Sequence, residues 1–155
     1  MTSWAFDTVL VANRGEIARR VIRTARRLGL RTVAVYSTAD IAAPHVREAD
    51  EAVLIGQSRP QDSYLNECAI LSAAKSTGAG AVHPGYGFLS ENAGFARQVE
   101  EAGLAFVGPA PAHLEAFGSK HTARDLARHA GVPLMAGTGL LASAADAVAA
   151  ASEIG

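Results

Sequence analysis

Short β-branched runs alternate with amphipathic segments of helical period along most of this chain, and no other feature restricts the possible folds as much. Helical spacing of apolar residues, with glycines suited to helix ends, marks 16–28, 63–74 and 90–102. Ser63 and Ser90 are the expected N-caps of the second and third helices. This order predicts an α/β fold, a Rossmann-like parallel sheet with helices on both faces. The strand-like runs are residues 8–12, 32–36, 52–55, 81–83 and 104–108.

The composition changes at residues 109–118, after the last predicted strand. Beyond this point we expect a helix over about 119–130 and an alanine-rich helix over 143–154, with no strand between them. Two helices and a connection bury little surface, so this region predicts only the beginning of a second domain. We therefore place one domain at residues 1–115 and an incomplete one at 116–155.

The bulk composition is that of a globular protein, with 49% hydrophobic and 19% charged residues. No apolar run is long enough to cross a bilayer, and the first residues lack the basic region and apolar core of a secretion signal. Cys68 is the only cysteine, which excludes an intrachain disulfide and a cysteine-based zinc site. We expect a cytoplasmic protein that binds no membrane.

Two loops follow predicted strands directly, "ANRGE" from Ala12 and "HPGYGFLSEN" from His83. Open parallel sheets bind ligands outside the carboxyl ends of their strands, where both loops would lie. Gly85 and Gly87 allow tight turns or a close backbone approach, and the next helix would present free amides to a ligand. The second loop is thus a candidate ligand rim, and a plain connection between strand and helix remains the alternative.

Seven of the fourteen Lys and Arg residues lie between Arg14 and Arg31, although the formal net charge is −1. On a helix, most of these arginines would lie opposite Ile17 and Val21, which indicates a solvated face. Aromatic residues are not interleaved with them, so a phosphate or nucleic-acid surface has less support. We expect no nucleic-acid partner, and a basic-helix interaction module stays as an alternative.

The usual signatures of nucleotide and metal sites do not occur in the sequence. Gly15 is the one glycine near the first loop, so G-x-G-x-x-G fails, and no G-x-x-x-x-G-K-[ST] occurs. A free-standing nucleotide-binding module would need such a phosphate loop and is kept only as an alternative. His121, Asp125 and His129 recur every four residues, but this spacing is common on exposed helices. We predict no metal site.

Four stretches taken together, "VLVANRGEIARRVIRTARRLGLRTVAVYS", "HVREADEAVLIG", "SYLN" and "HPGYGFLSENAGFA", closely resemble the N-terminal part of biotin carboxylases. These are the ATP-dependent components of biotin-dependent carboxylases. The similarity runs from about Phe6 to the end of the chain. Further on, "FGSKHTARDLARHAGVPL" and "GTGLL" look closest to the urea carboxylase branch, although Met135 and Ala136 depart from its usual "VPxxPG".

The resemblance implies a pre-ATP-grasp α/β domain, followed here by the first helices of a truncated ATP-grasp domain. It also implies a chemistry in which ATP and bicarbonate give carboxyphosphate, whose carbon dioxide passes to a ureido nitrogen of biotin. ATP, Mg²⁺ and biotin would be the cofactors of the full-length enzyme. We expect none of them to bind this chain tightly.

Site residues carry over from the family position by position. Lys120 matches a lysine that contacts the nucleotide. Tyr86 and Gly87 match positions that line the biotin and bicarbonate pocket, with Glu91 beside them at a helix N-terminus. A surface for subunit contact in the family matches Arg20, Arg23 and Arg27, the last at a position where an acidic residue is common.

The expected partners are the remaining ATP-grasp and C-terminal biotin carboxylase domains, a biotin carrier domain and a second copy of the full-length enzyme. The family's glycine-rich flap, magnesium-binding carboxylates and later catalytic lysine, histidine and arginine residues would follow Gly155. One lysine cannot supply phosphoryl transfer, which needs metal ions and several cationic groups. We therefore expect a fragment of a ligase that is inactive as this isolated chain.

Overall fold

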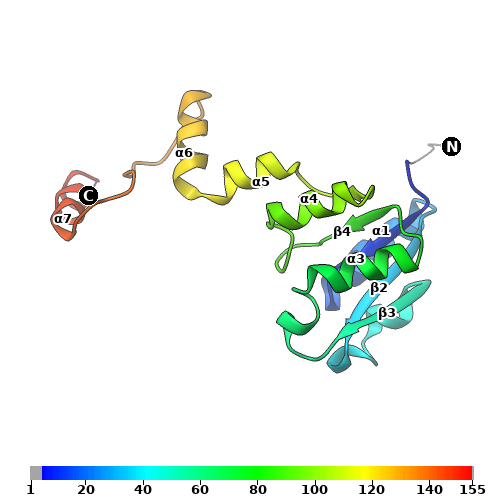
Figure 1. The fold of residues 1–155 in the computed structure, drawn as a ribbon. Helices are drawn as coiled ribbons and strands as arrows, with labels where there is room; N and C mark the ends of the chain where they lie inside the picture. Colours follow the sequence, from blue (N-terminus) through cyan, green and yellow to red (C-terminus); the bar gives the residue numbers. More distant parts are fainter. Residues whose placement is uncertain (1–4, 155) are drawn as a thin grey trace. The chain divides into compact units, whose positions relative to one another are not determined.

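The structure, a computed structural model, describes residues 5–154 and divides between Leu114 and Glu115 into two compact units. In the described part of the first unit, five strands form one sheet in the order β3-β2-β1-β4-β5. Every neighbouring pair is parallel, so the predicted α/β fold with a parallel sheet is confirmed (Figure 1). The strands are β1 (Thr8–Val11), β2 (Arg31–Ser37), β3 (Glu51–Gly56), β4 (Ala81–His83) and β5 (Ala105–Phe106).

The order of the strands changes direction at β1. The chain adds β2 and β3 on one side of β1, then returns to place β4 and β5 on the other. The crevice at such a switch point, outside the carboxyl ends of the strands, is the usual ligand site of an open parallel sheet. The loops after β1 and β4 meet here, because Val11 is opposite His83 and the Ala12 amide donates to the His83 carbonyl at 2.8 Å.

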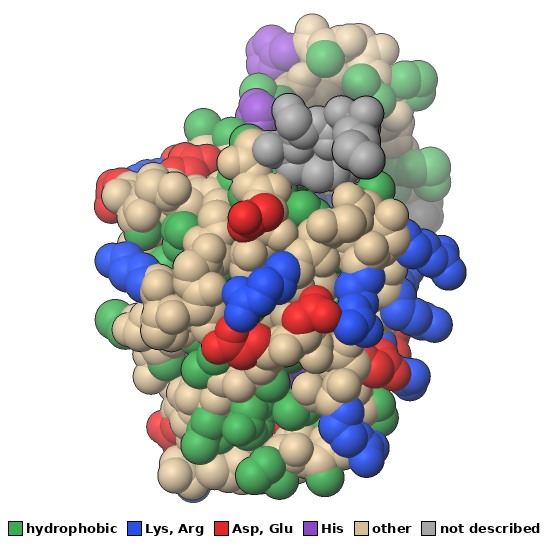
Figure 2. All heavy atoms as spheres, turned by 90° about the vertical axis from the view of Figure 1, so that its right-hand side faces the viewer, with side chains coloured by type: hydrophobic (Ala, Val, Ile, Leu, Met, Phe, Trp, Pro, Cys, Tyr) green, Lys and Arg blue, Asp and Glu red, His purple; other side chains and the backbone are tan. Residues whose placement is uncertain are grey.

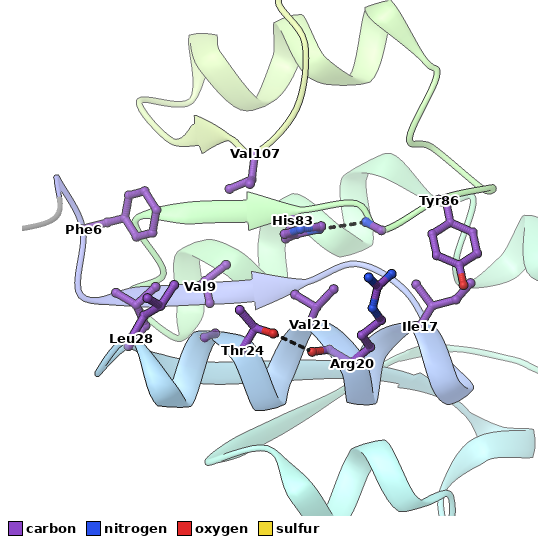
Figure 3. Close-up of a pocket in the computed structure, with 13 residues that line it drawn as sticks. Phe6, Val9, Ile17, Arg20, Val21, Thr24, Leu28, His83, Tyr86 and Val107 are labelled. Carbon is purple, nitrogen blue, oxygen red and sulfur yellow. Dashed lines mark hydrogen bonds between the residues drawn. The ribbon is translucent and has the colours of Figure 1, made fainter.

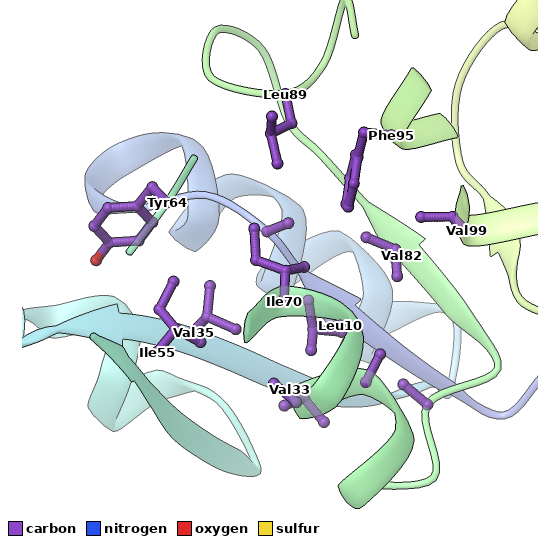
Figure 4. Packing of buried hydrophobic residues seen from close by; sticks show 14 residues of the cluster. Leu10, Val33, Val35, Ile55, Tyr64, Ile70, Val82, Leu89, Phe95 and Val99 are labelled. Atoms are coloured by element: carbon purple, nitrogen blue, oxygen red, sulfur yellow. The ribbon is translucent and has the colours of Figure 1, made fainter. Parts of the chain in front are cut away.

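Helices cover both faces of the sheet because successive side chains of each strand point to opposite sides. Leu10 belongs to a core that includes Phe95 of the fourth helix (Figure 4). Val11 packs on the other face with Ile22 of the first helix. β1 is buried along its whole length, which explains its continuous apolar run. The helices of this unit are α1 (Gly15–Arg27), α2 (Pro44–Glu48), α3 (Glu67–Ser76) and α4 (Ala93–Glu101), with 3-10 turns at Thr38–Asp40 and Pro60–Asp62.

Two helices begin later than the sequence predicted, each after an asparagine. Asn66 and Asn92 each accept a hydrogen bond at Oδ1 from the amide three residues later, at 3.0 and 2.8 Å. Ser63 instead donates its hydroxyl to a carbonyl of the preceding turn, and Ser90 lies within a turn. The predicted caps were therefore wrong by two or three residues, because turns intervene between each serine and its helix. The five-residue α2 is too short to show a helical period and was not predicted.

The second unit is helical, with no strand among its described residues. It contains α6 (Lys120–His129) and α7 (Ala144–Ile154), close to the predicted ranges, while α5 (Pro111–Gly118) spans the division and was not predicted. None of residues 115–154 is buried, so these helices enclose no core. Among residues 5–154, no helix combines the length and apolar character needed to cross a membrane.

We expect hydrogen exchange of the full 155-residue chain to separate the two units. β1 is buried and hydrogen-bonded on both edges, whereas the residues of α7 are exposed or half-buried. Amides of β1 should exchange roughly a hundredfold more slowly than those of α7, because only global opening exposes them. Equal protection at Leu10 and Val148, followed by NMR, would contradict this.

Candidate functional site

The loop after β4 has the conformation that its glycines predicted. Gly85 and Gly87 have φ angles of 67° and 72°, and Phe88 has a φ of 45°. His83 Nδ1 accepts a hydrogen bond from the Gly85 amide at 3.0 Å, which turns the chain directly after the strand (Figure 3). Burial lowers the pKa of His83, in keeping with a neutral ring that accepts at Nδ1. Tyr86 is thus flanked in the sequence by residues whose backbone is in the left-handed region.

Tyr86 is exposed and is oriented by a residue of the other loop. Its hydroxyl donates to Glu16 Oε1 at 2.5 Å, across a sequence separation of 70 residues. This hydrogen bond to a carboxylate raises the pKa of Tyr86, because it favours the protonated phenol. Glu16 lies in the first turn of α1, so "ANRGE" and "HPGYGFLSEN" form one continuous site.

A cavity of about 470 Å³ opens beside Tyr86, a volume within the usual range of small-molecule sites (Figure 3). One wall is the side of α1 that carries Ile17 and Val21, and Arg20 borders it too. Ala18 and Ile22, one position after Ile17 and Val21, are buried, and Ala25 is buried and also lines the cavity. The other wall includes His83, Gly85, Tyr86 and Val107.

Asp40 is a buried carboxylate in the 3-10 turn that follows β2. Asp40 accepts hydrogen bonds from Arg14, from the Tyr64 hydroxyl at 2.8 Å and from the Ser37 hydroxyl at 3.1 Å. Burial by itself would raise the pKa of Asp40, but the hydrogen bonds from Arg14, Tyr64 and Ser37 outweigh it and lower that pKa. Burial and the hydrogen bond to Asp40 raise the pKa of Tyr64 to about 12.

This network reaches the loop after β4 through aromatic stacking. The rings of Tyr64 and Phe88 lie nearly parallel, with centroids 5.1 Å apart. The Arg14 guanidinium lies over the Tyr64 ring at 5.8 Å. Sequence reasoning gave Asp40 and Tyr64 no role, and the isolated tyrosine in the polar stretch "DSYLN" was the one available signal.

The predicted pocket residues fall in two groups. Tyr86 and Gly87 lie at the tip of the loop, and Glu91 is exposed two residues before the first residue of α4. Gly87 faces open space, so a ligand could approach its backbone. Lys120 is exposed at the first position of α6, in the second unit.

The arginines of α1 are exposed or half-buried, and Arg19 and Arg26 form ion pairs. Arg20, Arg23 and Arg27 are exposed, and their predicted role in subunit contact stays a prediction. Arg20 is solvated, as predicted, but it does not lie opposite Ile17 and Val21, because it borders the same cavity as they do. On the face shown in Figure 2, basic and acidic side chains lie side by side. Ion pairs in and around α1 include Arg14–Asp40, Arg19–Glu48, Arg26–Asp50 and Arg31–Glu51.

No group of three His, Cys, Asp or Glu side chains among residues 5–154 could hold a metal ion. Asp125 forms an ion pair with Arg128, and His129 Nδ1 lies 2.7 Å from the Asp125 carbonyl. Asp125 and His129 therefore make local contacts on α6.

The first unit matches the model of a known protein family. The family model "Biotin carboxylase, N-terminal domain" matches residues 5–114, which include the whole sheet and both loops at its switch point. Biotin carboxylase 1 of Bacillus subtilis is 52% identical over 148 residues, or 95% of this chain. The chain spans 33% of the length of that protein.

Solved structures of multidomain carboxylases show the same fold. The biotin carboxylase domain dimer of Hydrogenobacter thermophilus 2-oxoglutarate carboxylase, in complex with MgADP, ADP and bicarbonate, is 47% identical with a TM-score of 0.90. The match covers 99% of this chain and 34% of that one. Kluyveromyces lactis urea carboxylase is also 47% identical, with a TM-score of 0.81, and the match covers 83% of this chain and 11% of that one.

Asp40→Asn should destabilise the 155-residue chain in a manner that depends on pH. Because the pKa of Asp40 is lowered on folding, its charge stabilises the fold above the unfolded pKa of about 3.9, and this stability is lost as the pH falls through the lower folded value. The variant should be less stable by about 1–3 kcal/mol at about pH 5. Urea titrations should show that difference shrinking toward about pH 2.5, and a constant difference would contradict the assignment.

Proposed function

The chain belongs to the biotin carboxylase N-terminal domain family, and we propose that it is the N-terminal part of an ATP-dependent biotin carboxylase. The match over residues 5–114 carries this proposal, because it includes both loops of the candidate site. In the proposed reaction ATP and bicarbonate give ADP and carboxyphosphate. Carboxyphosphate then breaks down to carbon dioxide and inorganic phosphate, and the carbon dioxide forms a bond with a ureido nitrogen of biotin, which gives up its proton.

We assign the residues of the first unit to the biotin side of this reaction. Tyr86 and Gly87 would form a wall of the biotin and bicarbonate pocket, with Glu91 at its border. The open space around Gly87 and the cavity beside Tyr86 support this role. Glu16 would set the direction of the Tyr86 hydroxyl through their hydrogen bond.

Lys120 would act on the nucleotide, in a region that we propose to be the beginning of an ATP-grasp domain at residues 116–155. Its ammonium would bind phosphate oxygens and reduce their charge. Mg²⁺ would neutralise the developing charge on the phosphates. We assign Mg²⁺ to the family's magnesium-binding carboxylates, which would follow residue 155 in the full-length enzyme.

We further propose that the full-length enzyme dimerises through the surface of Arg20, Arg23 and Arg27 and receives biotin on a carrier domain. The dimer of the Hydrogenobacter thermophilus domain supports an assembly of two copies. Urea is our proposed carboxyl acceptor, on the basis of "GTGLL" and the stretch from Phe117 to Leu134. The likeness to Kluyveromyces lactis urea carboxylase is compatible with this branch.

The isolated 155-residue chain should neither hydrolyse ATP with bicarbonate nor carboxylate free biotin. It spans 33% of the length of a Bacillus subtilis biotin carboxylase, and phosphoryl transfer needs several cationic groups held in place together. Bicarbonate-dependent phosphate release from a purified sample, free of contaminating enzyme, would contradict this.

Lys120→Ala, made in the full-length enzyme, should weaken ATP binding and leave folding nearly intact. A charge-assisted contact is worth about 1.5–3 kcal/mol, or roughly ten- to a hundredfold in Kd. Calorimetric titration with ATP measures this. Lys75→Ala is the matched control, because Lys75 is the other lysine of these 155 residues and is exposed on α3. If Lys120→Ala bound ATP with unchanged affinity, Lys120 would be a surface lysine without a role in ATP binding.

Tyr86→Ala should instead impair carboxyl transfer to biotin by about tenfold or more and change ATP affinity little, because it removes a pocket wall. Tyr86→Phe keeps the ring and removes only the hydrogen bond to Glu16, so its effect should be smaller. Biotin carboxylation assays beside ATP titrations separate the two effects. Equal loss in both assays would overturn the assignment of Tyr86 to the biotin side.

A further inference from the structure

Asn13 is a buried polar residue that the proposed reaction does not use. It follows the end of β1, is 0% exposed and lies beside the loop after β4. Its Nδ2 donates to the Pro84 carbonyl at 2.8 Å and to the Tyr86 carbonyl at 3.0 Å. Its Oδ1 accepts from the Arg14 amide at 2.9 Å. One side chain therefore connects the two loops across more than 70 positions of sequence.

The chemistry of its partners determines how the carboxamide of Asn13 is oriented. The two carbonyls of the loop are acceptors only, and the Arg14 amide is a donor only. A flipped carboxamide would place its oxygen against both carbonyls and would lose all three hydrogen bonds. Asparagine is the residue that matches this arrangement, because aspartate offers no donor when ionised and leucine offers none at all.

The loop is shaped around Asn13. Gly85, between the two carbonyls that Asn13 binds, has a φ of 67°, and a Cβ there would lie 2.7 Å from Asn13 Nδ2. Further along, Phe88 has a φ of 45°, a conformation that a non-glycine residue adopts only when its surroundings require it. Stacking on Tyr64 supports Phe88 at this end. The loop is held at its start by Asn13 and at its end by Tyr64, with Tyr86 between them.

We propose that Asn13 is a positioning residue, which holds residues 84–86 in the conformation that presents Tyr86 to biotin. The proposal rests on the proposed function of Tyr86, but the contact itself can be tested without it. Asn13 would not touch the substrate. Its effect would reach biotin through the backbone of the loop, whereas Glu16 acts on the hydroxyl of Tyr86.

The first test uses the unmodified 155-residue chain. An NMR experiment that detects coupling across hydrogen bonds should connect Asn13 Nδ2 to the carbonyl carbons of Pro84 and Tyr86. The Asn13 carboxamide protons should also exchange about tenfold or more slowly than those of the exposed Gln57. Missing couplings together with equally fast exchange would overturn the proposal, whatever the activity of the protein.

The second test compares two identical substitutions. Asn13→Asp removes the two N–H donors that bind the loop carbonyls, whereas Asn66→Asp keeps the acceptor that caps α3. In the full-length enzyme, Asn13→Asp should lower kcat/KM for biotin by roughly tenfold or more and leave the Kd for ATP within about twofold. Asn66→Asp should change neither. A proportional loss of biotin and ATP functions in Asn13→Asp would show a general structural role and overturn the proposal.

The two hypotheses fail separately. Normal biotin carboxylation by Tyr86→Ala would reject the proposed function of the loop. The hydrogen-bond couplings in the isolated chain would still decide whether Asn13 holds the loop. If Asn13→Asp does not fold, Gly85→Ala tests the same contact from the loop side, because its Cβ would lie 2.7 Å from both Asn13 Nδ2 and Ile17 Cγ2. Unchanged kcat/KM for biotin in folded Gly85→Ala would then overturn the positioning role.

Discussion

The parallel pairing of β1 with β4 is the contact on which the candidate site depends. β1 is buried on both faces and is paired with β2 on one edge and β4 on the other. The strand ends where the polar residues Asn13 and Arg14 follow its apolar run. The pairing places residue 13 beside residue 84 although 70 residues separate them in sequence. Every later feature of the site, from the hydrogen bonds of Asn13 to that between Glu16 and Tyr86, requires this neighbourhood.

The loops at this edge are ordered by polar groups that have little or no access to water. Asp40 has three donors around it, and Asn13 uses both of its Nδ2 hydrogens and its Oδ1. A buried polar group without a hydrogen-bond partner costs free energy in a region of low dielectric. The partners of Asp40 and Asn13 must therefore stay in place, which restricts the conformation of the loops that carry them. Phe88, whose backbone is in an unfavourable left-handed conformation, is supported at this edge by stacking on Tyr64, whose hydroxyl donates to Asp40.

Sequence reasoning succeeded where the signal is local and periodic. The strands were predicted from β-branched runs, and the left-handed turns at Gly85 and Gly87 from glycines placed directly after a strand. It failed where a short element or an intervening turn decides the outcome, as for α2 and the asparagine caps of α3 and α4. Asn13 was read only as the end of a strand, since nothing in its neighbours in sequence indicates the carbonyls that it binds.

The sequence by itself determined the alternation of strands and helices, the glycine positions of the loop and the membership of the family. These depend on the period of apolar residues and on local backbone freedom, which can be read along the chain. Tertiary structure alone decided that Ile17 and Val21 line a cavity while Ala18 and Ile22 are buried, and that Tyr64 supports Phe88. Such outcomes depend on which distant segments pack together, because a rotation of α1 by one residue, about 100°, changes which of its side chains face the core.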